Sequence, residues 1–104
     1  MNTRIINDLK DLIPIDTAIE KVVSTAAVAL VTTVPSGARY ARIQARGADL
    51  TYTMDNGTTT PVAAGPGFIL ANGSEITVRA QVALMIQGIR NASTDVDVQI
   101  QWMG

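Results

Sequence analysis

Apolar and polar residues alternate along most of this chain, from about residue 38 to residue 103. The pattern is clearest in the closing segment, where Val96, Val98, Ile100 and Trp102 share one parity and the residues between them are polar. A side-chain period of two is typical of a β-strand with one buried face and one solvent-exposed face. The sequence therefore predicts that most of the chain is built from such strands.

Turn-forming residues divide the alternating region into short strands. Pro35-Ser36-Gly37 predicts a turn, and the Asn-Gly pairs at residues 56–57 and 72–73 supply the positive φ angles that tight hairpin turns require. Pro61 and the Gly-Pro-Gly sequence at residues 65–67 predict an irregular connection, because neither residue type supports a regular ladder.

The stretch before residue 38 gives two further strands. Residues 15–23 alternate and are rich in β-branched side chains, which favours a strand over a helix begun by a capping box of Thr17 and Glu20. Residues 27–34 form the next predicted strand. The total of seven or eight strands predicts an all-β protein with a β-sandwich or jelly-roll-like fold. The later strands are predicted at residues 40–46, 50–54, 68–70, 76–80 and 95–102, with a buried, less regular stretch at 84–89.

The first residues follow a different period. Their apolar side chains recur at spacings of three and four, with charged or amide residues between them. This spacing predicts a short amphipathic helix that ends near Ile13, because Pro14 disfavours a helical residue before it. We therefore divide the chain into a helical arm at residues 1–14 and a β-domain at residues 15–104. The apolar stripe of the arm consists of Ile5, Ile6, Leu9, Leu12 and Ile13.

Both the arm and the composition indicate assembly. An isolated helix this short is marginal in water, so its stripe must dock on its own domain, on a sister subunit or on a different protein. Only 16% of the residues are charged, against a usual share of about 25%. Because a weakly charged β-rich chain with open sheet edges is prone to edge-to-edge pairing, we expect a homo-oligomer that buries part of this surface.

The composition also argues against several classes of function. The 104 residues fit one domain, and a formal net charge of -1 gives no general attraction to nucleic acid or to anionic membranes. The chain has no His and no Cys, so we expect no enzyme activity, no cofactor and no metal. The longest apolar run, residues 26–31, is too short to span a membrane, and the first residues lack a secretory signal. A soluble protein made in a cytoplasm is expected.

Three residues of one predicted strand are the candidate contacts of the β-domain. Tyr40, Arg42 and Arg46 share one parity, so they are expected on one strand face, where they could meet an acidic partner surface. The alternative is that the arginines face solvent or pair with Asp95 or Asp97 on a neighbouring strand, an interaction worth about 0.2–1 kcal/mol per pair.

Four carboxylates and the tryptophan receive simpler interpretations. Asp95 and Asp97 could share a cation, but two carboxylates without further oxygen ligands are more typical of a solvated polar face. Asp49 and Asp55 lie near loop ends, where turn capping is favoured over a paired catalytic role because no pocket is indicated. Trp102 shares its parity with aliphatic residues, so it is expected in the core or at a subunit interface.

Four segments stand in an order that is similar to a known pattern. They are Pro-Ser-Gly-Ala-Arg-Tyr-Ala-Arg-Ile-Gln at residues 35–44, Tyr-Thr-Met-Asp-Asn-Gly at residues 52–57, a Pro-to-Gly segment at residues 61–65 and the closing strand within residues 93–102. Their order and spacing resemble a family of small structural proteins from the virions of tailed phages. The resemblance covers roughly residues 15–103 and leaves the arm outside.

The resemblance implies a β-sandwich or jelly-roll subunit that decorates or cements a bacteriophage capsid as a homotrimer. The implied partners are the major capsid protein or another virion protein, and the implied location is the virion, after synthesis in the host cytoplasm. The alternatives are another virion position, such as neck, tail or fibre base, or a carbohydrate-binding β-sandwich. The residues expected to contact the partner are Ile5, Ile6, Leu9, Ile13, Tyr40, Arg42 and Arg46.

Overall fold

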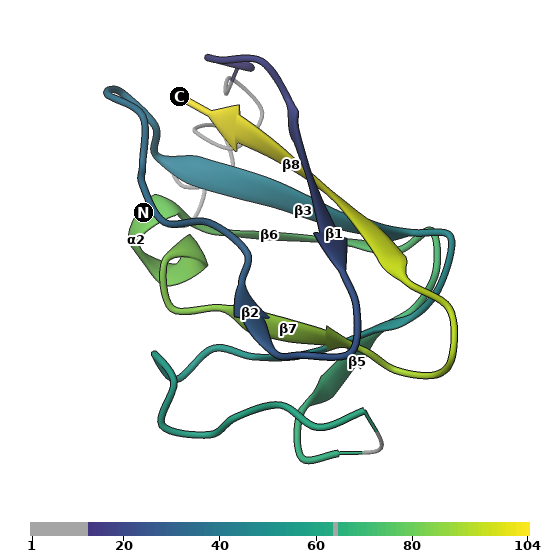
Figure 1. Cartoon of the computed structure of the whole chain (residues 1–104). Helices are drawn as coiled ribbons and strands as arrows, with labels where there is room; N and C mark the ends of the chain where they lie inside the picture. Colours follow the sequence, from purple (N-terminus) through teal and green to yellow (C-terminus); the bar gives the residue numbers. More distant parts are fainter. Residues whose placement is uncertain (1–12, 64) are drawn as a thin grey trace, which may run out of the picture.

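The computed structural model describes residues 13–63 and 65–104. Within these ranges the chain forms eight strands and one short helix, α2 (Ala80–Ala83). The strands lie in two antiparallel sheets of four strands each, so the protein is all-β, as the alternation predicts (Figure 1). The strands are β1 (Ile19–Val23), β2 (Val28–Ala29), β3 (Tyr40–Arg46), β4 (Leu50–Thr53), β5 (Phe68–Leu70), β6 (Glu75–Arg79), β7 (Gln87–Arg90) and β8 (Val96–Met103).

Sheet A has the strand order β1-β8-β3-β6. Its two central strands, β3 and β8, are the longest, with seven and eight residues. Along β3, Ala41, Ile43 and Ala45 are buried, and the residues between them are more exposed. Alternate residues of the strands in this sheet therefore face the core, and the residues between them, which are mostly polar, face outward.

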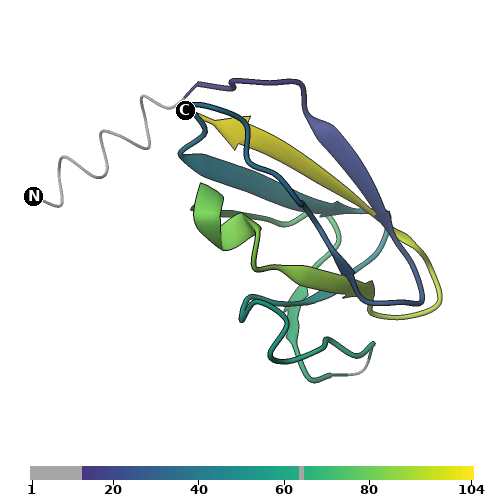
Figure 2. The same cartoon turned by 60° about the vertical axis from the view of Figure 1, so that its left-hand side comes forward.

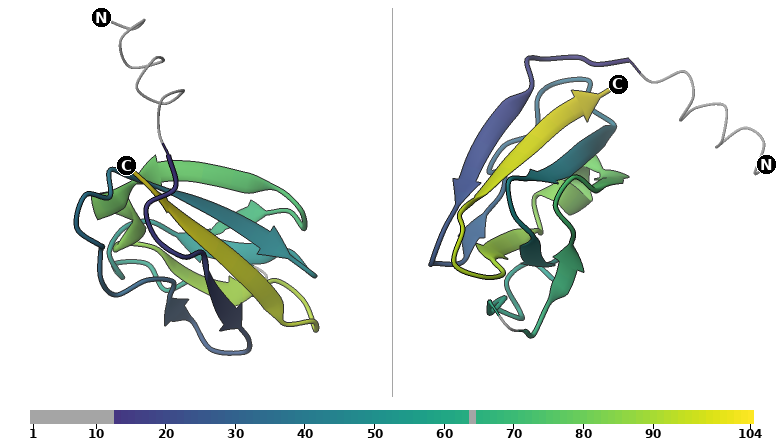
Figure 3. Two further views of the ribbon diagram at one scale, coloured as in Figure 1. Left: turned by 90° about the horizontal axis from the view of Figure 1, so that it is seen from above. Right: turned by 90° about the vertical axis from the view of Figure 1, so that its right-hand side faces the viewer.

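Sheet B has the order β2-β7-β4-β5 and consists of strands of two to four residues. Its outer face is covered by the loop at residues 54–67, which lies on the far side of sheet B from sheet A (Figures 1 and 3). Under this loop, the hydroxyl of Thr51 donates to Asn91 Oδ1 at 2.8 Å, and the hydroxyl of Thr53 donates to the carbonyl of Thr59 at 2.9 Å. The outer face of sheet B is thus covered over β4, whereas Ile69 on the neighbouring edge strand β5 is 61% exposed.

One hydrophobic core lies between the two sheets. Its large, fully buried side chains come from both, with Ile43 and Ile100 from sheet A and Leu50 from sheet B. Two alanines of α2 belong to the same cluster, and the helix closes one end of the space between the sheets (Figure 2). Trp102 is 3% exposed and also belongs to this cluster, which confirms its prediction as a core residue.

The strands pair in a regular order. β1 pairs with β8, β2 with β7, β3 with β6 and β4 with β5, all antiparallel. Two further pairs, β3 with β8 and β4 with β7, join these four pairs into the two sheets. The chain therefore follows the path of one long antiparallel ribbon that is folded over on itself.

The strand predicted at residues 27–34 is wrong in its extent. Only Val28–Ala29 are paired, as β2. The next two residues, Leu30 and Val31, are 4% and 6% exposed and both belong to the core cluster. Consecutive side chains of a strand point to opposite faces, so the backbone must leave strand geometry to bury both in one core.

The strand predicted at residues 76–80 also ends early. β6 ends at Arg79, and Ala80 begins the one-turn helix α2, which the alternation does not predict. Alanine has the highest helix propensity, and Ala80 and Ala83 are the buried residues of this turn, three positions apart. The less regular stretch at residues 84–89 is therefore the exit from a helix followed by the start of β7.

The Asn-Gly pairs form turns, but they do not form hairpins. Asn56 and Gly57 have φ angles of 57° and 83°, and Gly73 has a φ angle of 87°, so the predicted positive angles are confirmed at these three residues but not at Asn72. However, the first pair lies inside the loop at residues 54–67, and the second joins β5 of sheet B to β6 of sheet A. A local turn signal identifies a reversal of the chain, but it does not identify the strands that the reversal joins.

The predicted arm lies almost entirely outside the described residues. Ile5, Ile6 and Leu9 are not among them, so the arm helix and its boundary with the β-domain stay predictions. The first described residue, Ile13, is 62% exposed. Its amide donates to the carbonyl of Gly104 at 3.1 Å, and the amide of Gly104 donates back at 2.9 Å. The described chain thus begins beside its own last residue.

Candidate docking surfaces

The outer face of sheet A holds the three predicted contact residues of the β-domain. Tyr40, Arg42 and Arg46 lie on β3 and point away from the core, because the buried residues of this strand have the other parity. The two arginines are exposed, and Tyr40 is half-buried. The strand therefore brings the three side chains to one surface, as expected, while their role in binding stays a prediction.

Arg42 makes a contact that was not considered from the sequence, whereas Arg46 is exposed, as the solvent-facing alternative predicts. Arg42 Nη2 lies 2.6 Å from Glu75 Oε1 on the neighbouring strand β6. Arg46 lies opposite Asp97 of β8 in the register, but across the described ranges no ion pair joins these two side chains. Arg42 and Glu75 have side chains that are 48% and 45% exposed, so their pair contributes little stability and stays accessible to a partner.

A hollow beside Arg42 has a mixed lining. It has a volume of about 300 Å³ and is lined by Arg42, Glu75 and three glutamines, Gln44, Gln99 and Gln101, together with Pro14, Ala18 and Ile100. The glutamine amides offer both donors and acceptors, and the ion pair adds one charge of each sign. The hollow therefore offers a partner hydrogen bonds and charges as well as apolar contacts.

Asp95 is held by hydrogen bonds at the junction between the sheets. Its Oδ1 accepts from Ser24 Oγ and from Arg90 Nη1, both at 2.8 Å. These bonds, of which the one from Ser24 has the larger effect, lower the pKa of Asp95 below its ordinary value. Asp97 is exposed on β8, and among the described residues no group of three or more acidic side chains is placed to hold a metal ion.

Two other carboxylates cap loops, which confirms their prediction. Asp49 Oδ1 accepts from the backbone amide of Asn72 at 2.7 Å. Asp55 Oδ1 accepts from the backbone amide of Thr59 at 3.0 Å, and hydrogen bonding with Thr59 lowers the pKa of Asp55. Each carboxylate thus satisfies a backbone donor in a loop beside sheet B.

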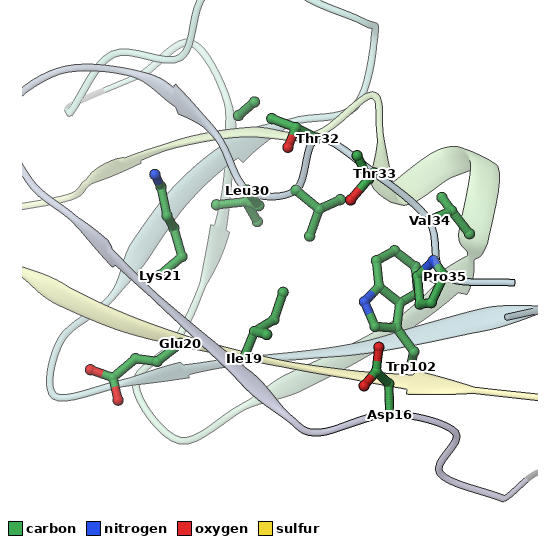
Figure 4. Close-up of a pocket in the computed structure, with 12 residues that line it drawn as sticks. Asp16, Ile19, Glu20, Lys21, Leu30, Thr32, Thr33, Val34, Pro35 and Trp102 are labelled. Carbon is green, nitrogen blue, oxygen red and sulfur yellow. The ribbon is translucent and has the colours of Figure 1, made fainter.

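A cleft at one edge of the molecule is not predicted by the sequence. It lies between the edge strand β1 and the segment at residues 30–35, and it encloses about 390 Å³ (Figure 4). Figure 4 shows Ile19 and Lys21 pointing from β1 toward Leu30, with Trp102 at one end of the cleft. The cleft therefore has a mixed lining, in which the apolar side chains of Ile19, Leu30 and Trp102 stand beside charged residues and threonines.

The sequence feature that could have indicated this cleft is the set of β1 residues that face the same side as the core. Ile19, Lys21 and Val23 point the same way, because they lie opposite the buried residues of β8. Val23 is fully buried, whereas Ile19 is 42% exposed. A lysine at a core parity indicates that the strand is leaving the core at that point. Without the sheet order, however, the sequence does not identify β1 as an edge strand.

The apolar end of sheet B is a further feature that the sequence does not predict. Phe68 and Ile69 on the edge strand β5 are 64% and 61% exposed. The ring of Phe68 contacts that of Tyr52, with 5.9 Å between the ring centroids. A neighbouring hollow is lined by Met54, Asp55 and Phe68. Exposed apolar side chains on an edge strand are typical of a contact surface.

No protein-family model, no curated protein and no solved structure matches this chain. No helix within residues 13–63 or 65–104 has the length and the apolar character needed to cross a membrane. The function is therefore argued from the surfaces described above, together with the pattern of the sequence.

Proposed function

We propose that this chain is a non-enzymatic structural protein of a bacteriophage virion, and that it decorates the capsid as a homotrimeric cement subunit. The proposal starts from the order of the segments between residues 35 and 102, which resembles small virion proteins of tailed phages. Such a subunit must join neighbouring capsid proteins, so it needs a stiff body with adhesive surfaces. Many copies then add their weak contacts through avidity.

The strand pairing supports a jelly-roll form of β-sandwich. A jelly roll is a double-sheet fold of eight strands, in which an antiparallel ribbon with its first strand paired to its last wraps into two sheets. The pairs of β1 with β8, β2 with β7, β3 with β6 and β4 with β5 agree with this arrangement. Jelly rolls occur in viral capsid domains and in lectins, so the fold is compatible with the virion role and with sugar binding.

The outer face of sheet A is the observation that carries the proposal. Its central strands β3 and β8 are each paired on both sides, so the side chains that they present sit on a rigid surface. Tyr40, Arg42 and Arg46 stand on this surface beside the glutamine-lined hollow. A backbone that is already rigid loses little conformational entropy on binding, which suits repeated contact with a protein shell.

Immunogold electron microscopy of purified phage particles tests this proposal. Particles of the phage that encodes the chain are purified on a density gradient and labelled with an antibody against the recombinant protein. Label spread over the whole shell is expected for a decoration subunit. Label at one vertex or on the tail would replace the cement role with a neck, tail or fibre-base position. Particles without label would overturn the virion role.

A carbohydrate-binding function is the second candidate, and one observation favours it. Phe68 is 64% exposed and lines a hollow together with Asp55. An exposed ring beside a carboxylate can stack on a sugar and accept hydrogen bonds from its hydroxyls. Against this candidate, Trp102, the one tryptophan of the chain, is buried. A glycan array decides: hits that Phe68→Ala abolishes support sugar binding, and an array without hits excludes it.

A further inference from the structure

We infer that Asn56 is a site of spontaneous deamidation, at which the side-chain amide is converted to aspartate or isoaspartate, while the folded chain protects Asn72 from the same reaction. The chain contains two Asn-Gly pairs, at residues 56–57 and 72–73. Asparagine is one of the chemically labile residue types of proteins. It reacts most readily before glycine, because glycine has no side chain to hinder its own backbone nitrogen. The inference goes beyond the proposed function and does not depend on it.

The reaction is an attack of the chain on itself. The backbone nitrogen of Gly57 gives its proton to hydroxide and forms a bond to Cγ of Asn56. The bond between Cγ and the side-chain nitrogen then breaks, and this nitrogen takes up protons from water and leaves as ammonia. One water molecule opens the resulting cyclic imide at either of its carbonyls. One opening gives aspartate, and the other gives isoaspartate, in which the main chain runs through the former side chain.

Exposure and local sequence do not distinguish the two pairs. All four residues are exposed. The first pair is followed by Thr58 and the second by Ser74, two similar hydroxyl residues. In an unfolded chain the two asparagines should therefore react at similar rates. A difference in the folded protein must come from the contacts that hold the reacting groups.

Hydrogen bonds hold both reacting groups of the second pair. Asn72 Oδ1 accepts from the backbone amide of Gly47 at 3.0 Å, so the side chain is fixed. The amide of Gly73, which would attack, donates to the carbonyl of Ala45 at 2.8 Å. The backbone amide of Asn72 also donates to Asp49 Oδ1 at 2.7 Å. Because attack would have to break the first two of these bonds together, the fold protects Asn72.

The first pair has no such restraint. Within residues 13–63 and 65–104, neither the side chain of Asn56 nor the backbone amide of Gly57 has a hydrogen-bond partner. The backbone amide of Asn56 donates to the carbonyl of Met85 at 3.2 Å, but this amide takes no part in the reaction. The side chain and the attacking nitrogen are therefore free to approach each other while the rest of the fold stays in place.

Isoaspartate at this position would loosen the turn. It adds one methylene group to the main chain between Asp55 and Thr58, and the 3.2 Å hydrogen bond from the Thr58 amide to the Asp55 carbonyl closes the turn across that point. Both products also place a new carboxylate next to Asp55 in the chain, and neighbouring like charges repel. We therefore expect the isoaspartate form to hold residues 55–59 less firmly than the aspartate form does.

Ageing of the full-length protein tests the inference. One sample is kept folded at mildly alkaline pH, which favours loss of the glycine amide proton, and a second is kept in urea at the same pH. Peptide mapping by mass spectrometry locates and quantifies the deamidated residues. In the folded sample we expect at least about a tenfold excess of product at Asn56 over Asn72, since attack at Asn72 must break two hydrogen bonds.

The sample in urea is the reference, and there the two sites should give comparable amounts of product. Equal amounts at the two sites in the folded sample would overturn the inference. A folded sample without product at Asn56, beside a urea sample that reacts at both sites, would also overturn it.

Two variants give a matched control. Asn56→Asp has no amide at the site, so ageing should no longer produce the acidic form that isoelectric focusing detects. Asn72→Asp keeps the acceptor oxygen that Gly47 contacts and should leave this acidic form in place. An acidic form that persists in folded Asn56→Asp would refute the assignment. The isolated isoaspartate form should have a lower Tm than Asn56→Asp, and equal Tm values would refute the loosening of the turn.

Discussion

Sheets A and B share one core, but they differ in what covers their outer faces. Sheet A presents polar side chains of β3 and β8 on its outer face. Sheet B has its outer face under the loop at residues 54–67, where Thr51 and Thr53 are 1% and 5% exposed. The same core is therefore held in two ways. Sheet A relies on the burial of one parity, and sheet B also relies on hydroxyls that must find hydrogen-bond partners under the loop.

The largest effect is expected on the inner face of sheet A, from Ile100→Ala. Ile100 is fully buried and lies between Ile19 of β1 and Ile43 of β3 in the register. Truncation should lower the free energy of unfolding by about 2–5 kcal/mol, because it removes buried methyl groups and leaves a cavity. Urea denaturation measures the loss. Gln99→Ala, on the outer parity of the same strand, should stay within about 0.5 kcal/mol of the parent, and a comparable loss there would refute the two-faced description.

The next effect, on the covered face of sheet B, is expected from Thr51→Val. The substitution keeps the β-branched shape but removes the hydroxyl that donates to Asn91 Oδ1 at 2.8 Å. It should lower the free energy of unfolding by about 1–3 kcal/mol, since the half-buried Asn91 Oδ1 loses its donor. Thermal and urea unfolding measure the change.

The matched substitution on the open face of sheet A is Thr77→Val. Thr77 lies on β6, pairs with Arg42 in the register and is exposed. Its replacement should change the free energy of unfolding by less than about 0.5 kcal/mol. If the two threonine variants were equally stable, the outer face of sheet B would not depend on its buried hydroxyls.

This contrast explains which strands the alternation could predict. The predicted strands at residues 40–46 and 95–102 correspond to β3 and β8, which have solvent on one face and the core on the other. In sheet B the polar Thr51 is buried and the apolar Ile69 is 61% exposed, so the polarity of a residue does not predict whether it is buried in this sheet. Periodicity is informative only where one face of a sheet meets water.

The candidate surfaces divide in the same way. That Tyr40, Arg42 and Arg46 share a face follows from one strand and its parity, so the sequence could predict it. The cleft beside Ile19 depends on β1 and β2 both being edge strands, which follows from pairing with β8 and β7 at the far end of the chain. Trp102 contributes to the cleft from that same distant strand. No local pattern reports such long-range pairing.

A smaller effect is expected at low pH, at the junction where Asp95 connects the sheets. Its partner Ser24 follows β1 of sheet A, and its partner Arg90 ends β7 of sheet B. The pKa of Asp95 is lowered from 3.8 in the folded state, so its stabilising contribution is present above that pKa and is lost as the pH falls through the folded-state pKa. The Tm should therefore fall as the pH drops below about 4.

The variant Asp95→Asn isolates this contribution. It cannot ionise, so its Tm should be lower than the parent's at pH 7, and the difference should shrink as the pH is lowered toward 2–3. Differential scanning calorimetry across this range measures both curves. Asp97→Asn, two positions further along, removes the same charge outside the hydrogen bonds with Ser24 and Arg90 and serves as the control. A constant difference between Asp95→Asn and the parent would contradict the role of the ionised carboxylate.

The smallest effect on stability is expected where the proposed function predicts the largest effect on binding. Arg42 and Arg46 stand on the open face of sheet A, and Arg42 makes only a half-exposed ion pair. The double variant R42A/R46A should cost about 1 kcal/mol of stability or less. Its affinity for purified phage shells should nevertheless fall by about tenfold, since two surface charges are removed from the contact. A sedimentation assay measures the retained protein.

R42K/R46K keeps both charges and separates charge from shape. Retention at the parental level would assign the contact to charge, and a loss as large as that of R42A/R46A would assign it to the planar guanidinium groups. Full retention by R42A/R46A would remove this face from the docking surface and leave the edges of the two sheets as the adhesive part of the molecule.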